Sequence, residues 1–253
     1  MLDGYVPGVD IQVGTSGWQY ADWRGAFYPA KLPQRLWLSY YVERFDTVEV
    51  NATFYRLPSA DAVARWADAL PDGFSMVIKA SRFLTHVKRL REPAEPVERL
   101  LKVLAPLRER SMLGPVLVQL PPDLEAEPER LDETLAEFPS GVRVAVEPRH
   151  ASWFTPEVRE LLGRRNAALV WADREGRSMS PLWETADWHY LRLHHGRYTW
   201  RYDERDLRRW ARRIGAASSG YVFTNNDPGA AAIADARRFR ELLATAGQPN
   251  ALV

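Results

Sequence analysis

The sequence contains eight short β-like runs, and each of them ends in polar residues at its carboxyl end. The runs lie near residues 11–16, 47–54, 74–80, 115–120, 142–147, 168–173, 188–194 and 221–226. Most are rich in Val, Ile and Leu, which is typical of strands that are covered on both faces. Most are also followed by a helical pattern, near residues 34–44, 60–70, 94–110, 128–138, 156–165, 203–215 and 229–246. We therefore expect an α/β protein with a single (β/α)8 TIM-type barrel.

The length of 253 residues fits one such barrel and is short for two ordinary α/β domains, so we expect a single domain over residues 1–253. Residues 174–187 are the exception to the strand–helix alternation. Ser180 and Pro181 interrupt the helical pattern there. The sequence therefore predicts an irregular sixth crossover. Ser59 and Thr155 are the predicted N-caps of two helices.

Composition excludes several classes of protein. The chain has no cysteine, which excludes disulfides, thiolate metal sites and a cysteine nucleophile. The first residues lack the pattern of a signal peptide, and no apolar run approaches the ~18 residues of a membrane span. The net charge of +1 gives no globally basic footprint for nucleic acid. We expect a cytoplasmic protein that does not bind membranes.

Alternation along the runs places charged side chains on one face near the carboxyl ends. Glu49 follows this pattern in the second run, Glu147 in the fifth, and Arg192 with His194 in the seventh. A barrel gathers its carboxyl ends in one mouth, where barrel enzymes carry their active sites. Burying so many charges without partners is very costly, so we expect these groups to pair, to bind a ligand, or both.

Seven segments resemble one known family in order along nearly the whole chain. They are GTSGW (14–18), FDTVEVNATFY (45–55), Thr85-His86 after FSMVIKA (74–80), QLPP (119–122), VEPRH (146–150), YLRLHHG (190–196) and FTNND (223–227). Together they resemble the YecE-like family, domain of unknown function 72. The resemblance implies a TIM-type barrel and supplies no established reaction. The doubled histidine departs from a single His-Gly at that point, and alternation favours His194 over His195 as the inward residue.

Two carboxylates across a barrel mouth are the equipment of acid–base catalysis, as in glycoside hydrolysis. Glu147 and Glu49 are the candidate pair, with His194 to shuttle a proton or bind phosphate and Lys79 to stabilise developing negative charge. The alternative is that each glutamate is the counter-ion of a neighbouring base, such as Arg192.

Three further kinds of site are compatible with the mouth. The loops after the last two runs, with a helix that begins near Pro228, favour a phosphate, although Asp227 is equally suited to cap that helix. A divalent metal is a weaker alternative, with His86, Glu147, Asp173 and His194 as oxygen and nitrogen ligands that lack a local spacing. No nucleotide-cofactor motif is present, so the cofactor remains unassigned. Aromatic residues form either a stacking wall or an apolar lid: Trp18, Tyr20, Trp23, Tyr55, Trp153, Tyr198, Trp200 and Tyr202.

The sequence thus favours an enzyme that acts on a phosphorylated or polyhydroxylated small molecule, or on a phosphodiester. The alternative is a non-catalytic nucleic-acid-binding protein that uses the aromatic and arginine side chains of the mouth. A small-molecule sensor is a third hypothesis. The expected substrate-binding residues are Ser16, Trp18, Asn51, Tyr55, His86, Gln119, Arg149, Asp173, Arg192, Asn225 and Asn226.

Overall fold

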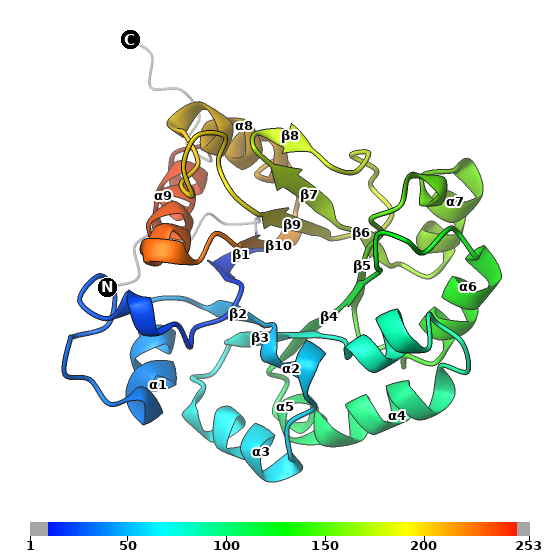
Figure 1. Cartoon of the computed structure of the whole chain (residues 1–253), viewed down its shortest axis with the longest axis horizontal. Coiled ribbons are helices and arrows are strands. Elements are labelled where there is room, and N and C mark those ends of the chain that lie inside the picture. Colours follow the sequence, from blue (N-terminus) through cyan, green and yellow to red (C-terminus); the bar gives the residue numbers. More distant parts are fainter. Residues whose placement is uncertain (1–9, 247–253) are drawn as a thin grey trace.

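The computed structural model describes residues 10–246, and its strands form two five-stranded sheets (Figure 1). The first sheet is parallel, in the order β2 (Thr47–Val50), β3 (Ser75–Lys79), β4 (Leu113–Gln119), β5 (Val144–Glu147) and β6 (Ala168–Leu169). The second has the order β1 (Asp10–Thr15), β10 (Ser219–Thr224), β9 (His189–Leu193), β7 (Trp171–Arg174) and β8 (Arg177–Ser178). In this sheet only β8 is antiparallel to its neighbour.

The expected single closed (β/α)8 barrel is wrong, because no continuous ladder joins the two sheets among the described residues. Between β1 and β2 the one bridge is Ser16 to Glu49. The Tyr41 hydroxyl lies between these strands, where it accepts from the Thr15 N–H at 3.0 Å and donates to the Thr47 carbonyl at 3.1 Å. A side-chain hydroxyl thus takes the place of ladder hydrogen bonds at this seam.

The second seam lies where the sixth predicted run is divided. β6 pairs with β5 in the first sheet, whereas β7 pairs with β9 in the second sheet. Only Val170 separates β6 from β7 in the sequence. Residues 174–187 contain no helix; the chain turns back after β7 into the short antiparallel strand β8.

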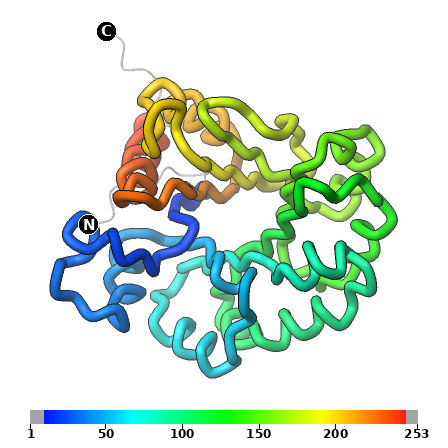
Figure 2. Tube along the Cα trace, in the orientation of Figure 1, coloured from blue at the N-terminus to red at the C-terminus, as the bar shows by residue number. Residues whose placement is uncertain are grey.

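Helices surround the two sheets. Figure 2 shows β1 beside β10, which lies near the other end of the chain. The helices are α1 (Trp37–Val42), α3 (Ala60–Ala69), α4 (Ala94–Val103), α5 (Ala105–Glu109), α6 (Pro128–Ala136), α7 (Pro156–Arg164), α8 (Glu204–Ile214) and α9 (Ala231–Ala246). The caps at Ser59 and Thr155 are confirmed, because their hydroxyls accept from the N–H groups of Ala62 and Val158. No helix among residues 10–246 is long and apolar enough to cross a membrane.

Short helical turns follow several strands. They are α2 (Ala52–Tyr55), a π-turn (Phe83–Val87), and 3-10 turns at Ala21–Trp23, Gln34–Leu36, Ala151–Trp153 and Pro228–Ala230. The second strand is therefore shorter than predicted and becomes helical from Ala52 onwards.

The core has two parts, one between the sheets and the helices and one enclosed by the strands. The enclosed part includes Val77, Leu117, Ala145 and Tyr190. Side chains on a strand repeat every second residue, so the next inward positions toward the carboxyl ends are Lys79, Gln119, Glu147 and Arg192. An apolar floor therefore lies beneath a polar layer.

Candidate functional site at the strand carboxyl ends

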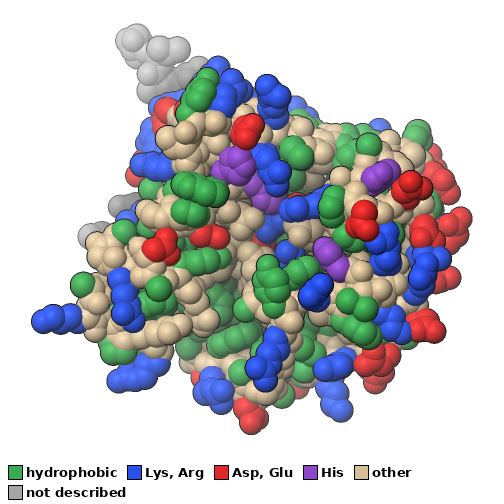
Figure 3. Space-filling view, viewed as in Figure 1, with side chains coloured by type: hydrophobic (Ala, Val, Ile, Leu, Met, Phe, Trp, Pro, Cys, Tyr) green, Lys and Arg blue, Asp and Glu red, His purple; other side chains and the backbone are tan. Residues whose placement is uncertain are grey.

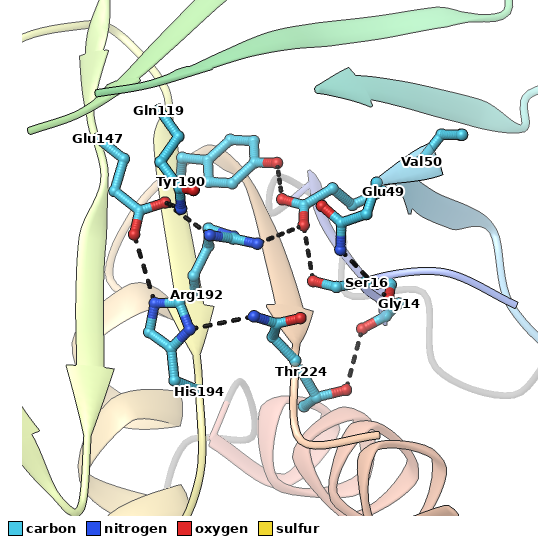
Figure 4. A network of polar contacts seen from close by, with 12 residues as sticks. Gly14, Ser16, Glu49, Val50, Gln119, Glu147, Tyr190, Arg192, His194 and Thr224 are labelled. Atoms are coloured by element: carbon cyan, nitrogen blue, oxygen red, sulfur yellow. Dashed lines mark hydrogen bonds and ion pairs between the residues drawn. The ribbon is translucent and has the colours of Figure 1, made fainter. Parts of the chain in front are cut away.

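Arg192 on β9 stands at the centre of this polar layer (Figure 4). Its guanidinium forms ion pairs with Glu49 on β2 at 2.7 Å and with Glu147 on β5 at 2.6 Å. The exposed fractions of the three side chains are 1%, 0% and 3%. One arginine thus binds both carboxylates and links the two sheets.

Both glutamates have their carboxylate oxygens occupied by donors. Glu49 accepts from the Ser16 hydroxyl at 2.7 Å and from the Tyr190 hydroxyl at 2.6 Å. Glu147 accepts from the Gln119 amide at 2.8 Å and contacts His194 Nε2 at 3.3 Å. These contacts favour the counter-ion interpretation of the glutamates, and their assignment as the acid–base pair stays a prediction.

The protonation state of Glu147 follows from its neighbours. Burial raises the pKa of Glu147, but Arg192 and the hydrogen bond from His194 outweigh burial and hold the pKa well below its usual value. Glu147 is therefore a carboxylate at neutral pH and has no proton to donate.

His194 faces this layer, as alternation predicted, whereas His195 contacts the carbonyl of Gly196. The Nδ1 atom of His194 lies 3.1 Å from the Asn225 side-chain nitrogen. Burial lowers the pKa of His194 despite the contact with Glu147, so the ring is neutral at pH 7. Both contacts are satisfied when Nε2 carries the proton and Nδ1 accepts from Asn225.

Two further cations, Lys79 and Arg149, stand beside the glutamates. The Lys79 ammonium is 9% exposed, lies 4.2 Å from the ring centroid of Phe54, and makes no ion pair or hydrogen bond with another described residue. Burial and the charge of Arg192 lower the pKa of Lys79 to about 8. Arg149 is about one-third exposed and reaches Glu147 only at 3.5 Å.

The layer therefore carries one positive charge more than its carboxylates neutralise. Arg192, Lys79 and Arg149 give three positive charges, Glu49 and Glu147 give two negative charges, and His194 is neutral. Figure 3 shows Lys, Arg and His side chains gathered near the centre of this face. We name the polar layer the carboxyl-end site: Ser16, Glu49, Lys79, Gln119, Glu147, Arg149, Arg192, His194 and Asn225.

Two other predicted binding residues lie beside this site. The Asn51 amide nitrogen is 3.5 Å from the Ser16 carbonyl, and its Oδ1 is buried without a partner among the described residues. His86 lies in the π-turn, where its Nδ1 atom is hydrogen-bonded to the Thr85 hydroxyl at 2.9 Å. Burial lowers the pKa of His86, and the charge of Lys79 lowers it further.

Three predicted binding residues lie outside the carboxyl-end site, and their role in ligand binding stays a prediction. Trp18 is buried in the outer core against Trp66. Asp173 accepts from the Trp210 indole at 2.9 Å and from Arg209 at 3.2 Å, because side chains of α8 reach it. Asn226 is buried and donates both to the Trp200 carbonyl and to Asp235 on α9.

Of the eight aromatic residues expected as a stacking wall or an apolar lid, four are buried in the core: Trp18, Trp23, Trp153 and Tyr202. The indoles of Trp23 and Trp153 donate to backbone carbonyls. Tyr20 is half-buried. The exposed members are Tyr55, Tyr198 and Trp200, which follow β2 and β9.

The four residues suggested as metal ligands do not converge. Glu147 and His194 are in contact, but Asp173 is held by α8 and His86 lies beside Phe54. Within residues 10–246 no group of three or more His, Asp or Glu side chains is arranged to hold a metal ion.

Sequence reasoning named Asp227 only as a helix cap beside the expected phosphate loop and did not count it among the catalytic residues. Its predicted role as an N-cap is wrong, because its side chain makes no capping hydrogen bond. Asp22 accepts instead from the N–H of Gly229, at 2.9 Å. The pairing of Asp22 with the last loop depends on a contact across 207 residues, which no local pattern reveals.

Known proteins match the chain over most of its length. The family described as "Protein of unknown function DUF72" matches residues 12–252. UPF0759 protein YunF of Bacillus subtilis (strain 168) is 24% identical over 273 residues, which covers 92% of this chain and 94% of YunF. UPF0759 protein YecE of Escherichia coli (strain K12) is 30% identical over 149 residues, 57% of this chain and 50% of YecE.

Solved structures agree with these matches. A DUF72 family protein from Thermotoga maritima MSB8 has a TM-score of 0.83 and 28% identity, and the match covers 92% of this chain and 99% of that one. A DUF72 family protein from Enterococcus faecalis V583 has a TM-score of 0.78 at 20% identity and shares the fold.

Proposed function

We propose a function from the site itself, because the chain belongs to the DUF72 family of proteins of unknown function. The protein is an enzyme that binds a phosphorylated or polyhydroxylated small molecule, or a phosphodiester. It acts on this ligand by acid–base chemistry at the carboxyl-end site. The observation that supports this proposal most is the Lys79 ammonium, which is nearly buried and has no anionic partner in contact among residues 10–246.

An ammonium in this position is costly unless something compensates it. Buried charges are normally paired, because desolvation disfavours the charged form. The lowered pKa of Lys79 reports that cost. An anion that enters the site supplies the missing charge, and Arg149, which is only loosely held by Glu147, supplies a second group for the same anion.

Polar side chains around these cations suit the hydroxyl groups of a ligand. The buried Oδ1 of Asn51 accepts no hydrogen bond from a described residue, so it is available to a ligand hydroxyl. Asn225 and His194 present an amide and a neutral ring from the other sheet. Glu147 positions His194 as a carboxylate positions the histidine of other acid–base sites.

A ligand screen tests this proposal. Sugar phosphates and inorganic phosphate are compared with the same sugars without phosphate, by thermal shift and then by turnover of the compounds that bind. We expect more stabilisation from a phosphorylated compound than from the same sugar without phosphate, because only the phosphorylated compound compensates the Lys79 ammonium. A ligand at about 100 times its Kd adds about 2.7 kcal/mol.

Two variants make the screen specific to the site. Lys79→Met is expected to lose the stabilisation, whereas Lys102→Met, an exposed lysine of α4, keeps it. Equal stabilisation of the two variants by the phosphorylated compounds would contradict the role of Lys79, and stabilisation by none of the compounds would contradict the proposal.

A second candidate function is supported by the exposed aromatic residues. Tyr198 is 84% exposed, Tyr55 75% and Trp200 53%, and exposed aromatic faces can stack on the bases of a single strand. Short single-stranded DNA in the same screen tests this candidate. Affinity that falls steeply with salt would favour it, and absent binding would exclude it.

A further inference from the structure

Asp227 differs from the buried carboxyl groups of the fold because it forms no ion pair with another described residue. The five fully buried acids among the described residues each form an ion pair with an arginine: Glu49, Glu147, Asp173, Asp206 and Asp235. Asp227 is half-buried, its Oδ1 atom is buried, and this atom makes no hydrogen bond to a described residue. Its side chain is therefore not held by the fold in the way that the others are.

The backbone of Asp227 is nevertheless fixed. Its carbonyl accepts from the Trp23 indole at 2.9 Å and from the N–H of Ala230 at 3.1 Å. Asp22, and not Asp227, accepts the hydrogen bond from the N–H of Gly229. A fixed backbone thus presents a carboxyl group whose Oδ1 atom has no hydrogen bond to a described residue, while the Tyr20 hydroxyl lies within hydrogen-bonding reach of the group.

The surroundings of Asp227 connect it to the carboxyl-end site. The residue comes two positions after Asn225, which contacts His194. The Tyr20 hydroxyl lies within hydrogen-bonding reach of the Asp227 carboxyl and donates to the Ser16 carbonyl at 2.6 Å, and the Ser16 hydroxyl donates to Glu49. The other charged groups that act on it are Glu49, Arg192 and Asp22.

We infer that Asp227 is the carboxyl group that donates and accepts the proton at this site, an inference that rests on the proposed function. It takes the role for which the sequence suggested Glu49 and Glu147. Those two glutamates, bound on every side by donors, then serve to hold Arg192 and to position His194.

The electrostatics of the group agree with that role. Burial and the charge of Glu49 raise the pKa of Asp227 to about 7, although the Tyr20 hydroxyl and Arg192 act in the opposite direction. A general acid or base works best when its pKa lies near the working pH. Glu147 stays ionised under the same conditions, so the two carboxyl groups are held in different protonation states and have different roles.

Asp227 completes the proton transfers in the hydrolysis of a phosphate ester. Water attacks the phosphorus, the bond from phosphorus to the ester oxygen breaks, and the leaving oxygen takes the proton of Asp227. The Asp227 carboxylate then receives a proton from the attacking water. The products are the alcohol and phosphate, and the aspartic acid is regenerated.

Carboxyl ¹³C NMR titration of the whole protein tests the inference. The resonance of Asp227 is identified by its absence in Asp227→Asn, with Asp72→Asn, an exposed turn residue, as the control. We expect a midpoint near 7 and a rise of this midpoint when inorganic phosphate saturates the site, because a nearby anion disfavours the carboxylate. A midpoint below about 5, or one that saturating phosphate does not move, would overturn the inference.

Calorimetry with inorganic phosphate on the wild type separates failure of the proposed function from failure of this inference. Absence of phosphate binding counts against the proposed function, and the inference then falls with it. Normal phosphate binding with an Asp227 midpoint in the ordinary acidic range overturns the inference alone.

Kinetics supply a second readout for any phosphate ester that the wild type turns over. Asp227→Asn is expected to lower kcat by about 10²–10⁴-fold with little change in KM, because the variant binds the ester and lacks the proton. An unchanged kcat would overturn the inference. Equal losses in Asp72→Asn would do the same.

Discussion

Lys79 gives the residue-scale prediction that bears most directly on ligand binding. Its pKa of about 8 means that the ammonium loses its proton just above neutral pH. The affinity for inorganic phosphate should therefore fall as the pH rises through about 8, and Lys79→Met should bind more weakly with no such step. Titration calorimetry on both proteins measures this. A step of equal size in the two proteins would assign it to another group.

Asp227 predicts a pH dependence of stability. Its pKa is raised from 3.8 to about 7, so between these values the folded protein holds a proton that the unfolded chain has released. Stability that depends on Asp227 is thus fully present below 3.8 and is lost as the pH rises to about 7. The Asp227→Asn variant has no carboxyl group at this position, so its stability does not fall for this reason as the pH rises. Its advantage over the wild type should grow across the window to at most about 4 kcal/mol, since each pKa unit is worth about 1.4 kcal/mol.

Urea unfolding at several pH values across that window measures the effect, with Asp72→Asn as the control. Parallel pH profiles for the wild type and Asp227→Asn would show that Asp227 titrates in its ordinary range. Parallel profiles for the wild type and Asp72→Asn are expected in any case, because Asp72 is exposed.

Glu147→Gln replaces a carboxylate that donors surround. The amide that it introduces brings its own N–H groups toward Arg192, Gln119 and His194. Removing one partner of a buried ion pair costs about 3–5 kcal/mol, so we expect a stability loss of that size together with loss of turnover. Urea unfolding against Glu160→Gln, an exposed residue of α7, measures the first part. A loss below about 1 kcal/mol would place Glu147 among weakly coupled surface charges.

At the scale of elements, the seam between β1 and β2 depends on close approach at Gly14. A Cβ atom at Gly14 would lie 2.1 Å from the Thr47 carbonyl oxygen, which belongs to the backbone and has little freedom to move. Gly14→Ala should therefore destabilise the protein by about 1–3 kcal/mol or more. Gly163→Ala on α7 is the matched control, with nothing within 4 Å of the new Cβ and an expected gain of up to about 1 kcal/mol. Equal effects of the two changes on thermal unfolding would refute the seam's role.

The helices, the strands and the inward side chains of the strands could be predicted, because each follows a regular spacing of residues along the sequence. Alternation of two along β9 placed Tyr190, Arg192 and His194 on one face, and the structure confirms that placement. The seams could not be predicted in this way. The Tyr41 hydroxyl enters between β1 and β2 from α1, and only the packed molecule brings it there.

Contacts between distant elements also explain why some residues expected in the opening lie elsewhere. Trp18 and Trp153 follow strand ends, where an aromatic ring can lie over the opening or turn back into the core, and both turn into the core. Asp173 ends its strand like the site residues do, but Trp210 and Arg209 on α8 hold it outside the site. The sequence around a residue does not reveal such contacts between distant elements.

For the whole molecule, the net charge of +1 gives no hint of a binding site, whereas the carboxyl-end site concentrates cations at one end of the strands. The resemblance of seven segments identified the family, which the match over residues 12–252 confirms. Family membership implies no reaction, and the proposed chemistry rests on the positions of Lys79, Arg149 and Asp227.

A crystal structure of the protein soaked with tungstate, a phosphate analogue that anomalous scattering locates without ambiguity, is the most direct test of the central claim. We predict one tungstate ion in the carboxyl-end site, with oxygens within about 3.2 Å of the Lys79 ammonium and the Arg149 guanidinium. The ion should be absent from Lys79→Met crystals soaked in the same way. Tungstate bound elsewhere while this site stays free of it would contradict the claim.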